Sequence, residues 1–314
     1  MNTVKPTRNI AMKNSISSLI PLMLVSAAFL NAQAPAERTF ATPQEAAQAL
    51  VDAAAQNDTA ALLKLFGPQG RDIVESGDTA EDKTARSEFS NRAHEKMDVR
   101  IEPYNHDRAT VVTGADSWPF PVPLVRMKSG QWRFDSARGR TEILARRVGR
   151  NELVAIDVSR GYVEAQMEYA SQDYDADGLL EYAQRIVSTP GKKDGLYWDG
   201  GSDNLVPKDF AEAADAMSVA GKKVPYHGYY FRILTAQGPD APGGAHSYIV
   251  KGEMIGGFAL IAYPAEYGVS GIKTFMVNHD GVVYEKDLGP TTTLLARQTT
   301  RFNPDKTWQA IQGE

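Results

Sequence analysis

Residues 173–184 hold the side chains of this sequence that are best suited to bind a metal ion. Three aspartates alternate with other residues and a glycine follows, which is the D-x-D-x-D-G order of calcium-binding loops. Alternate carboxylates converge when a chain wraps around Ca²⁺, a hard cation that takes about six to eight oxygen ligands. The segment therefore predicts a Ca²⁺ site whose ligands are Asp173, Asp175, Asp177, the carbonyl of Leu179, Glu181 and Gln184.

The last of these ligands departs from the pattern. Gln184 stands where an EF-hand loop has a bidentate glutamate, so the site lacks one charge and one oxygen ligand. We therefore expect weak binding, with a Kd of about 10⁻⁴ to 10⁻³ M. The alternative is an acidic turn exposed to solvent, in which the like charges repel one another.

A second group of side chains could line a groove for a sugar or a peptide. Aromatic residues in the second half of the chain are interleaved with glycines, and aromatic faces beside glycines suit ligands that stack. Within this group His227 and Glu266 could form an acid–base pair. The alternative is that the aromatic residues fill the core and the sheet faces. The candidate groove residues are Trp198, Tyr226, His227, Tyr229, Tyr263, Glu266 and Tyr267.

Signatures of common catalytic sites are missing from the sequence. The chain has no cysteine, which removes thiol nucleophiles and thiolate metal sites. Its five histidines lack the H-x-H and H-E-x-x-H spacings of zinc sites, and the G-x-S-x-G, Walker and G-x-G-x-x-G motifs do not occur. We assign no catalytic residue and expect the protein to bind its partners without catalysis.

The elements that would position these side chains divide into two sets, of which the first predicts helices followed by strands. Residues 42–66 predict a helical hairpin that begins at Thr42, and residues 81–96 predict a third helix. Short strands are predicted at 99–101, 109–112, 121–125 and 131–134, with turns at 105–107 and 128–130. This order predicts an α+β domain over residues 37–140, with N-terminal helices on a curved antiparallel sheet, which resembles the NTF2-like fold.

The second set begins after the arginine-rich residues 138–150, where we place a boundary to a second domain over residues 141–314. A long helix is predicted over residues 151–171, with Asn151 as its N-cap, and its many apolar positions predict that it is largely buried. A short helix at 207–219 and strands at 229–235, 245–250, 257–263, 274–277 and 282–286 should follow. This α+β arrangement of a long helix and an antiparallel meander resembles the globular part of type IV pilins (pilin-like).

The first 36 residues predict a cleavable Sec-type signal peptide. Basic residues precede an uncharged apolar run at 16–30, which is short for a membrane span, and alanines at 32, 34 and 36 suit cleavage. Met12 is a second possible start, since the segment that follows it forms a complete signal. We therefore expect a periplasmic protein that contacts the membrane only through this segment before cleavage. Without a cysteine it is not a lipoprotein.

The negative net charge of the chain makes some classes of binding partner unfavourable. Cleavage after Ala36 removes three cations and no acid, so the formal charge changes from −5 to −8. An acidic protein is poorly suited to bind nucleic acid. We expect the partner to be an envelope protein or a glycan.

Several strings in the mature part of the chain are distinctive enough to indicate a family. They are FATPQEAAQA (40–49), WPFP (118–121), GRNEL (149–153), DGLYW (194–198), YHGYYF (226–231) and YPAEYGVSG (263–271). With these strings the chain resembles the DUF2950 family of exported bacterial proteins of unknown function. The resemblance supports export and implies no catalytic residue. The sequence thus predicts an exported binding or structural module with a role in envelope assembly, and a hydrolase or sugar-active enzyme that uses the aromatic, glycine-rich second half is the alternative.

Overall fold

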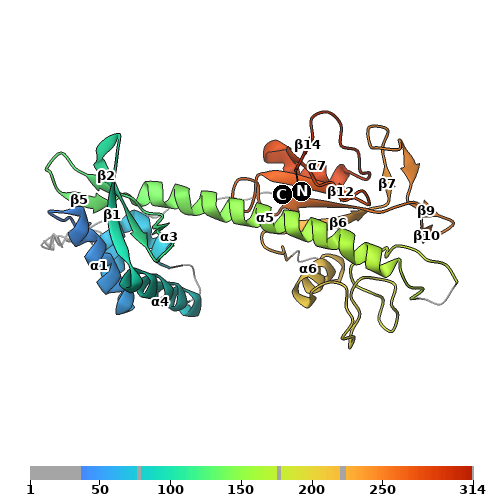
Figure 1. Cartoon of the computed structure of the whole chain (residues 1–314), viewed down its shortest axis with the longest axis horizontal. Helices are drawn as coiled ribbons and strands as arrows, with labels where there is room; N and C mark the ends of the chain where they lie inside the picture. Colours follow the sequence, from blue (N-terminus) through green and yellow to red (C-terminus); the bar gives the residue numbers. More distant parts are fainter. Residues whose placement is uncertain (1–36, 76–78, 175–177, 220–223, 313–314) are drawn as a thin grey trace, which may run out of the picture.

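The computed structural model describes residues 37–75, 79–174, 178–219 and 224–312, and it shows an α+β protein. Figure 1 shows two lobes joined by one long helix, α5 (Ser136–Tyr169). Each lobe contains its own cluster of buried apolar side chains. The α+β class predicted from the sequence is confirmed.

The N-terminal lobe begins with helices, as predicted. They are α1 (Pro43–Ala55), α2 (Thr59–Phe66), the 3₁₀ helix η1 (Pro68–Gly70), α3 (Arg71–Val74) and α4 (Thr79–Glu95). Thr42 caps α1 by accepting a hydrogen bond from Glu45 N, and Asp58 caps α2 by accepting one from Ala61 N. These side chains satisfy backbone N–H groups that have no partner in the first turn of a helix. The helical hairpin was therefore predictable from the sequence.

An antiparallel sheet completes this lobe. Its strands are β1 (Met97–Glu102), β2 (Asn105–Thr113), β3 (Trp118–Pro119), β4 (Leu124–Arg126) and β5 (Trp132–Phe134). They follow the order β1-β2-β4-β5, and β3 pairs with β2. The turn predicted at residues 105–107 is wrong, because these residues begin β2 and pair with β1 around a shorter turn.

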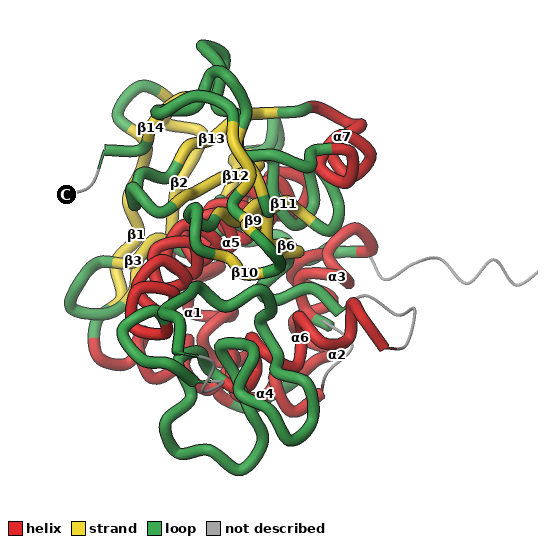
Figure 2. Tube along the Cα trace, turned by 90° about the vertical axis from the view of Figure 1, so that its right-hand side faces the viewer, coloured by secondary structure: helices red, strands yellow, loops and turns green. Residues whose placement is uncertain are grey.

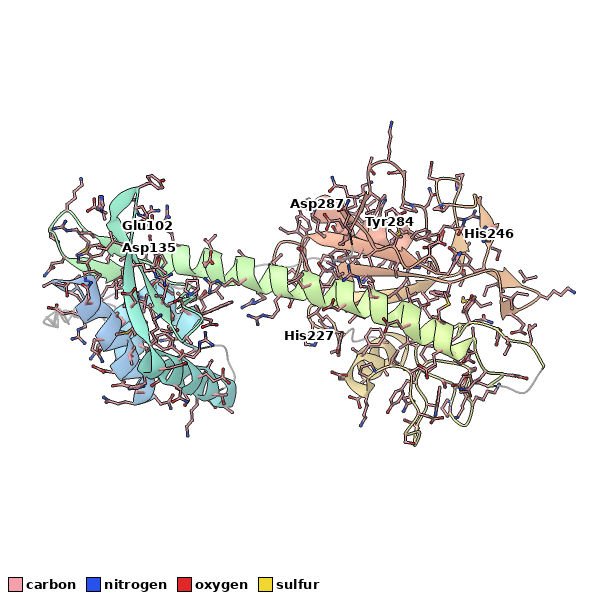
Figure 3. All side chains as sticks on the ribbon, in the orientation of Figure 1. Glu102, Asp135, His227, His246, Tyr284 and Asp287 are labelled. Atoms are coloured by element: carbon pink, nitrogen blue, oxygen red, sulfur yellow. The ribbon has the colours of Figure 1, made fainter. Side chains whose placement is uncertain are left out.

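Helix α5 begins fifteen residues earlier than the sequence predicted, at Ser136 in place of Asn151. Asp135 is its N-cap, and Figure 3 shows this residue where α5 leaves the N-terminal lobe. The arginines that suggested a boundary are good helix formers, so α5 continues through this segment over about 50 Å. Its burial is also lower than predicted, since Leu153 is 64% exposed and Met167 is 44% exposed.

The C-terminal lobe contains short helices and a second antiparallel sheet. The helices are α6 (Lys208–Val219), the 3₁₀ helix η2 (Gly289–Thr291) and α7 (Thr292–Gln298). The strands of the sheet are β6 (Tyr229–Leu234), β11 (Ala259–Pro264), β12 (Lys273–Asn278), β13 (Tyr284–Asp287) and β14 (Gln309–Ala310). Two small hairpins pair β7 (Ala236–Gln237) with β8 (His246–Ser247) and β9 (Ile249–Val250) with β10 (Glu253–Met254).

The main sheet has the order β14-β13-β12-β11-β6, and every residue of β11 is buried. Helix α5 packs against β11 and β12. Glu152 on α5 fixes this packing, because its Oε1 accepts hydrogen bonds from Ile272 N at 2.9 Å and from Lys273 N at 3.0 Å. Among the described residues, no helix combines the length and apolarity needed to span a bilayer.

Candidate functional site

The last turns of α5 anchor the irregular segment that follows it. Gln166 is fully buried, and its amide pairs with both backbone groups of Ala183: Nε2 donates to the carbonyl at 2.7 Å and Oε1 accepts from the N–H at 2.8 Å. Tyr169 Oη donates to the Lys193 carbonyl at 2.8 Å. Two points of a segment without regular structure are therefore fixed by one rigid helix.

Between these points the chain makes a tight turn over residues 189–192. The Lys192 N–H donates to the Thr189 carbonyl at 2.9 Å, and Gly191 has a φ of +82°, which favours glycine. Asp194 accepts from Thr189 N at 2.7 Å and from Thr189 Oγ1 at 2.8 Å. Partial burial acts to raise the pKa of Asp194, but these hydrogen bonds outweigh it and lower the pKa overall. Asp194 is therefore an ionised clamp for the turn.

Lys193 lies against aromatic rings beside this turn. Its Nζ is 4.4 Å from the centre of the Trp198 ring and 5.5 Å from that of Tyr174. Asp203 joins the group, because it accepts from Lys193 Nζ at 3.0 Å and from Trp198 Nε1 at 3.1 Å. Tyr174 stacks in turn on Tyr169 of α5 at 4.9 Å between ring centres. The cluster holds the indole and the ammonium in a fixed relation to α5.

These groups surround a cavity of about 850 Å³, the size of a typical ligand pocket. Its wall carries both signs of charge, and Trp198 is its largest aromatic side chain. Ser188 also lines it, and its Oγ is buried without a hydrogen-bond partner in the described part of the chain. The acids and bases of the wall are Glu181, Asp194, Asp199 and Glu253, with Arg185, Lys192 and Lys193.

Two of the calcium ligands predicted from the sequence, Glu181 and Gln184, line this cavity. Both bond to the β9–β10 hairpin: Gln184 donates to the Gly252 carbonyl at 2.7 Å, and Glu181 accepts from Met254 N at 3.3 Å. Asp173 accepts a hydrogen bond from Gly178 N at 2.8 Å. Leu179, the predicted backbone ligand, is exposed.

Asp175 and Asp177 lie outside the described residues, so the calcium site stays a prediction. Within the described ranges, no three histidine, aspartate or glutamate side chains converge as metal ligands.

The predicted aromatic groove residues are distributed over more than one place. Trp198 lines the cavity, whereas Tyr229 and Tyr263 are each 1% exposed on neighbouring strands. Burial raises the pKa of Tyr229, and its Oη donates to the Lys273 carbonyl at 2.8 Å. These two tyrosines are core residues of the sheet, whereas Trp198 lines the cavity of about 850 Å³.

The remaining groove residues lie on two adjoining loops. Tyr226 and His227 form the turn before β6, and Glu266 and Tyr267 follow β11. A hydrogen bond of 2.9 Å from Ala265 N to the Gly228 carbonyl holds the loops together. Figure 3 shows His227 at the end of the C-terminal lobe nearest the N-terminal lobe, and His246 far from it. Among the described residues, His227 and Glu266 are not joined by a hydrogen bond.

The sequence did not identify Lys193, Arg185 and Glu253 as members of a site. Glu253 is 60 residues from Lys193 in the chain, and only the fold brings it to the same cavity. One signal was present: the DGLYW string at residues 194–198 contains both Asp194 and Trp198.

Comparison with known proteins gives one match. A family model described as "Protein of unknown function (DUF2950)" covers residues 37–311. No curated protein matches the chain, and no solved structure matches it. The resemblance seen in the sequence is confirmed over nearly the whole described part of the chain, which belongs to the DUF2950 family.

Proposed function

We propose that this protein is an exported, non-catalytic binding module of the bacterial envelope, and that it holds a glycan in the cavity beside the end of α5. The observation that carries the proposal is the cavity wall, in which the buried Trp198 stands among carboxylates and cations. The wall is built on α5 through Gln166 and Tyr169, so its shape does not depend on flexible loops alone.

The chemistry of the wall suits a hydroxyl-rich ligand. Each sugar hydroxyl both donates and accepts a hydrogen bond, and the wall offers acceptors such as Glu253 and donors such as Arg185 and Lys192. The apolar face of a sugar ring suits an aromatic side chain, and the partly exposed Tyr174 lines this wall. The unpartnered hydroxyl of Ser188 would gain a hydrogen bond from such a ligand.

Three further expectations belong to this proposal. The basic and apolar order of residues 1–36 supports export to the periplasm by a Sec-type signal peptide. The helices and curved sheet of the N-terminal lobe support an NTF2-like relationship. The long helix followed by an antiparallel sheet supports a pilin-like relationship for the C-terminal lobe.

Titration calorimetry of the mature chain with soluble envelope saccharides, preselected on a glycan array, tests the proposal. We expect saturable binding that weakens at least about tenfold in Arg185→Ala and in Glu253→Gln, because each change removes a charged hydrogen-bonding group. The matched control is Arg126→Ala, an exposed arginine of the N-terminal lobe that should change the Kd by less than about twofold. Absence of binding to every saccharide would refute the glycan proposal.

The same samples test the calcium loop. Ca²⁺ at about ten times its Kd should raise the Tm of thermal unfolding by roughly 3–5 °C relative to the Tm measured with a chelator. An equal shift with Mg²⁺ would indicate a general cation site, and no shift at millimolar Ca²⁺ would identify the loop as an acidic turn.

A hydrolase is the alternative, and the four carboxylates on the cavity wall favour it. Mass spectrometry of the saccharides after incubation separates the two functions, since only a hydrolase shortens them.

A further inference from the structure

A second cavity, of about 600 Å³, lies in the N-terminal lobe between the loop at residues 118–123 and the first half of α5. Pro119, Phe120, Pro121 and Pro123 line it with their rings, and the one backbone N–H among them, that of Phe120, already donates to the Val111 carbonyl at 2.7 Å. Helix α5 approaches this loop closely, because a Cβ at Gly139 would lie only 2.6 Å from Val122 Cγ2. This wall of the groove is therefore apolar and lies close against α5. The cavity beside the end of α5 shares no lining residue with it.

Arginines of α5 form the other wall of this groove. Arg146 donates from Nε to Glu142 Oε1 and from Nη1 to the Pro119 carbonyl, each at 2.8 Å, and its guanidinium lies 5.4 Å from the centre of the Trp118 ring. Its remaining N–H groups make no hydrogen bond within the described part of the chain. Arg138 also lines the groove, and its only ion pair there, with Asp135, is long at 3.7 Å.

The charge of this region is opposite to that of the whole protein. Residues 136–150 contain five arginines and one glutamate, whereas the chain as a whole has a formal charge of −5. Glu142, which also lines the groove, already pairs with Arg146 at 2.8 Å. Arg146 lies four residues from Arg150, a like-charge spacing that destabilises a helix, and a further acidic group would relieve this repulsion. Trp118, at the end of the groove, is 53% exposed and offers a large apolar contact.

We propose that this groove binds an extended acidic peptide segment of a partner protein, with one apolar side chain on Phe120 and the prolines and with carboxylates on Arg138 and Arg146. The fixed guanidinium of Arg146 suits a carboxylate, which it can bind through two N–H groups. An acidic polysaccharide supplies the charge without the apolar side chain. A bilayer with anionic headgroups also supplies negative charge. Figures 1 and 2 show both lobes extending beyond α5, and the vesicle experiment described below separates a membrane from a peptide.

Fluorescence anisotropy with a labelled peptide in which glutamate alternates with leucine tests the proposal on the mature chain. Arg138→Glu should weaken binding at least about tenfold, and added salt should weaken it further. Arg147→Glu is the matched control, because it makes the same charge change about half a turn around the helix from Arg138 and does not line the groove. We expect it to change the Kd by less than about threefold.

Thr141→Trp provides a variant that keeps every charge. Thr141 is exposed and lines the groove, so an indole there should fill the volume and abolish binding without disturbing the core. Three outcomes would overturn the proposal: no peptide binding, an equal loss in Arg147→Glu, or equal binding of polyglutamate that lacks leucine. Equal binding of phospholipid vesicles with anionic headgroups would assign the arginines to a membrane instead.

Discussion

At the scale of single residues, Gln166 has a structural role that no local sequence pattern indicates. Its side-chain amide makes with Ala183 the two backbone hydrogen bonds that a neighbouring strand would otherwise make. Its Nε2 also donates to Tyr162 Oη at 2.9 Å. A polar side chain with no exposed surface is stable in a core only when its hydrogen bonds are satisfied, as they are here.

Replacing Gln166 by leucine should lower the free energy of unfolding by about 2–5 kcal/mol. The change leaves the N–H and the carbonyl of Ala183 buried and unpaired, at about 1–3 kcal/mol each. Urea denaturation of the mature chain measures the effect. Gln172→Leu, at an exposed position three residues beyond α5, should cost less than about 0.5 kcal/mol. Similar losses in the two variants would contradict this role for Gln166.

The acidic loop shows how far residue patterns predict a site. The alternating aspartates and the glycine predicted a calcium site at residues 173–184, which stays a prediction because Asp175 and Asp177 lie outside the described residues. The partners of Glu181 and Gln184 are on the β9–β10 hairpin, 73 and 68 residues away in the chain. Contacts over such separations leave no local signal, so the cavity was not predictable from the sequence.

At the scale of elements, capping residues and apolar spacing predicted α1 and α2 correctly, but the predicted start of α5 was wrong. The first two helices begin at side chains that cap them within three residues. Helix α5 contains glycines at 139 and 149. Together with the arginines, these glycines led us to predict a domain boundary within the segment that forms the first half of the helix. Tertiary contacts decide the outcome: Ser136 Oγ donates to the Phe66 carbonyl at 2.6 Å and fixes the first turn on the N-terminal lobe.

The two glycines of α5 should respond to alanine in opposite directions. A Cβ at Gly149 meets no atom within 4 Å, so Gly149→Ala should raise the free energy of unfolding by about 0.5–1 kcal/mol through helix propensity. Gly139→Ala should lower it by about 1–3 kcal/mol, because the methyl group collides with Val122. Urea denaturation measures both. Restoration of stability by Val122→Ala in the Gly139→Ala background would show that the collision is the cause, and no restoration would exclude it.

At the scale of the whole molecule, α5 is the covalent connection between two separate hydrophobic clusters. Its hydrogen bonds with the N-terminal lobe extend to Arg146, and those with the C-terminal lobe begin at Asn151. The division into domains at residues 140 and 141 stays a prediction, and the segment between these contacts is where it can be tested.

Trypsin should cut the mature chain slowly at Arg147 and Arg150, because cleavage requires the helix to open locally. Gly149→Pro should accelerate these cuts about tenfold or more, since proline inside a helix costs about 3 kcal/mol. Two stable fragments, one from each lobe, are expected by gel electrophoresis and mass spectrometry. Gly149→Ala is the control and should slow the cuts. If each fragment is degraded as soon as it forms, the lobes are not independent domains.

Because α5 is continuous, the number of residues between the lobes determines both their distance and their relative rotation about the helix axis. Each residue of an α-helix advances the chain by about 1.5 Å and turns it by about 100°. The groove beside Arg138 and the cavity beside Tyr169 therefore stand at a set spacing of about 45 Å along the axis and at a set dihedral angle about it. One inserted residue would swing one binding face by more than a quarter of a circle. Seven would nearly restore the angle and lengthen the spacing by about 10 Å.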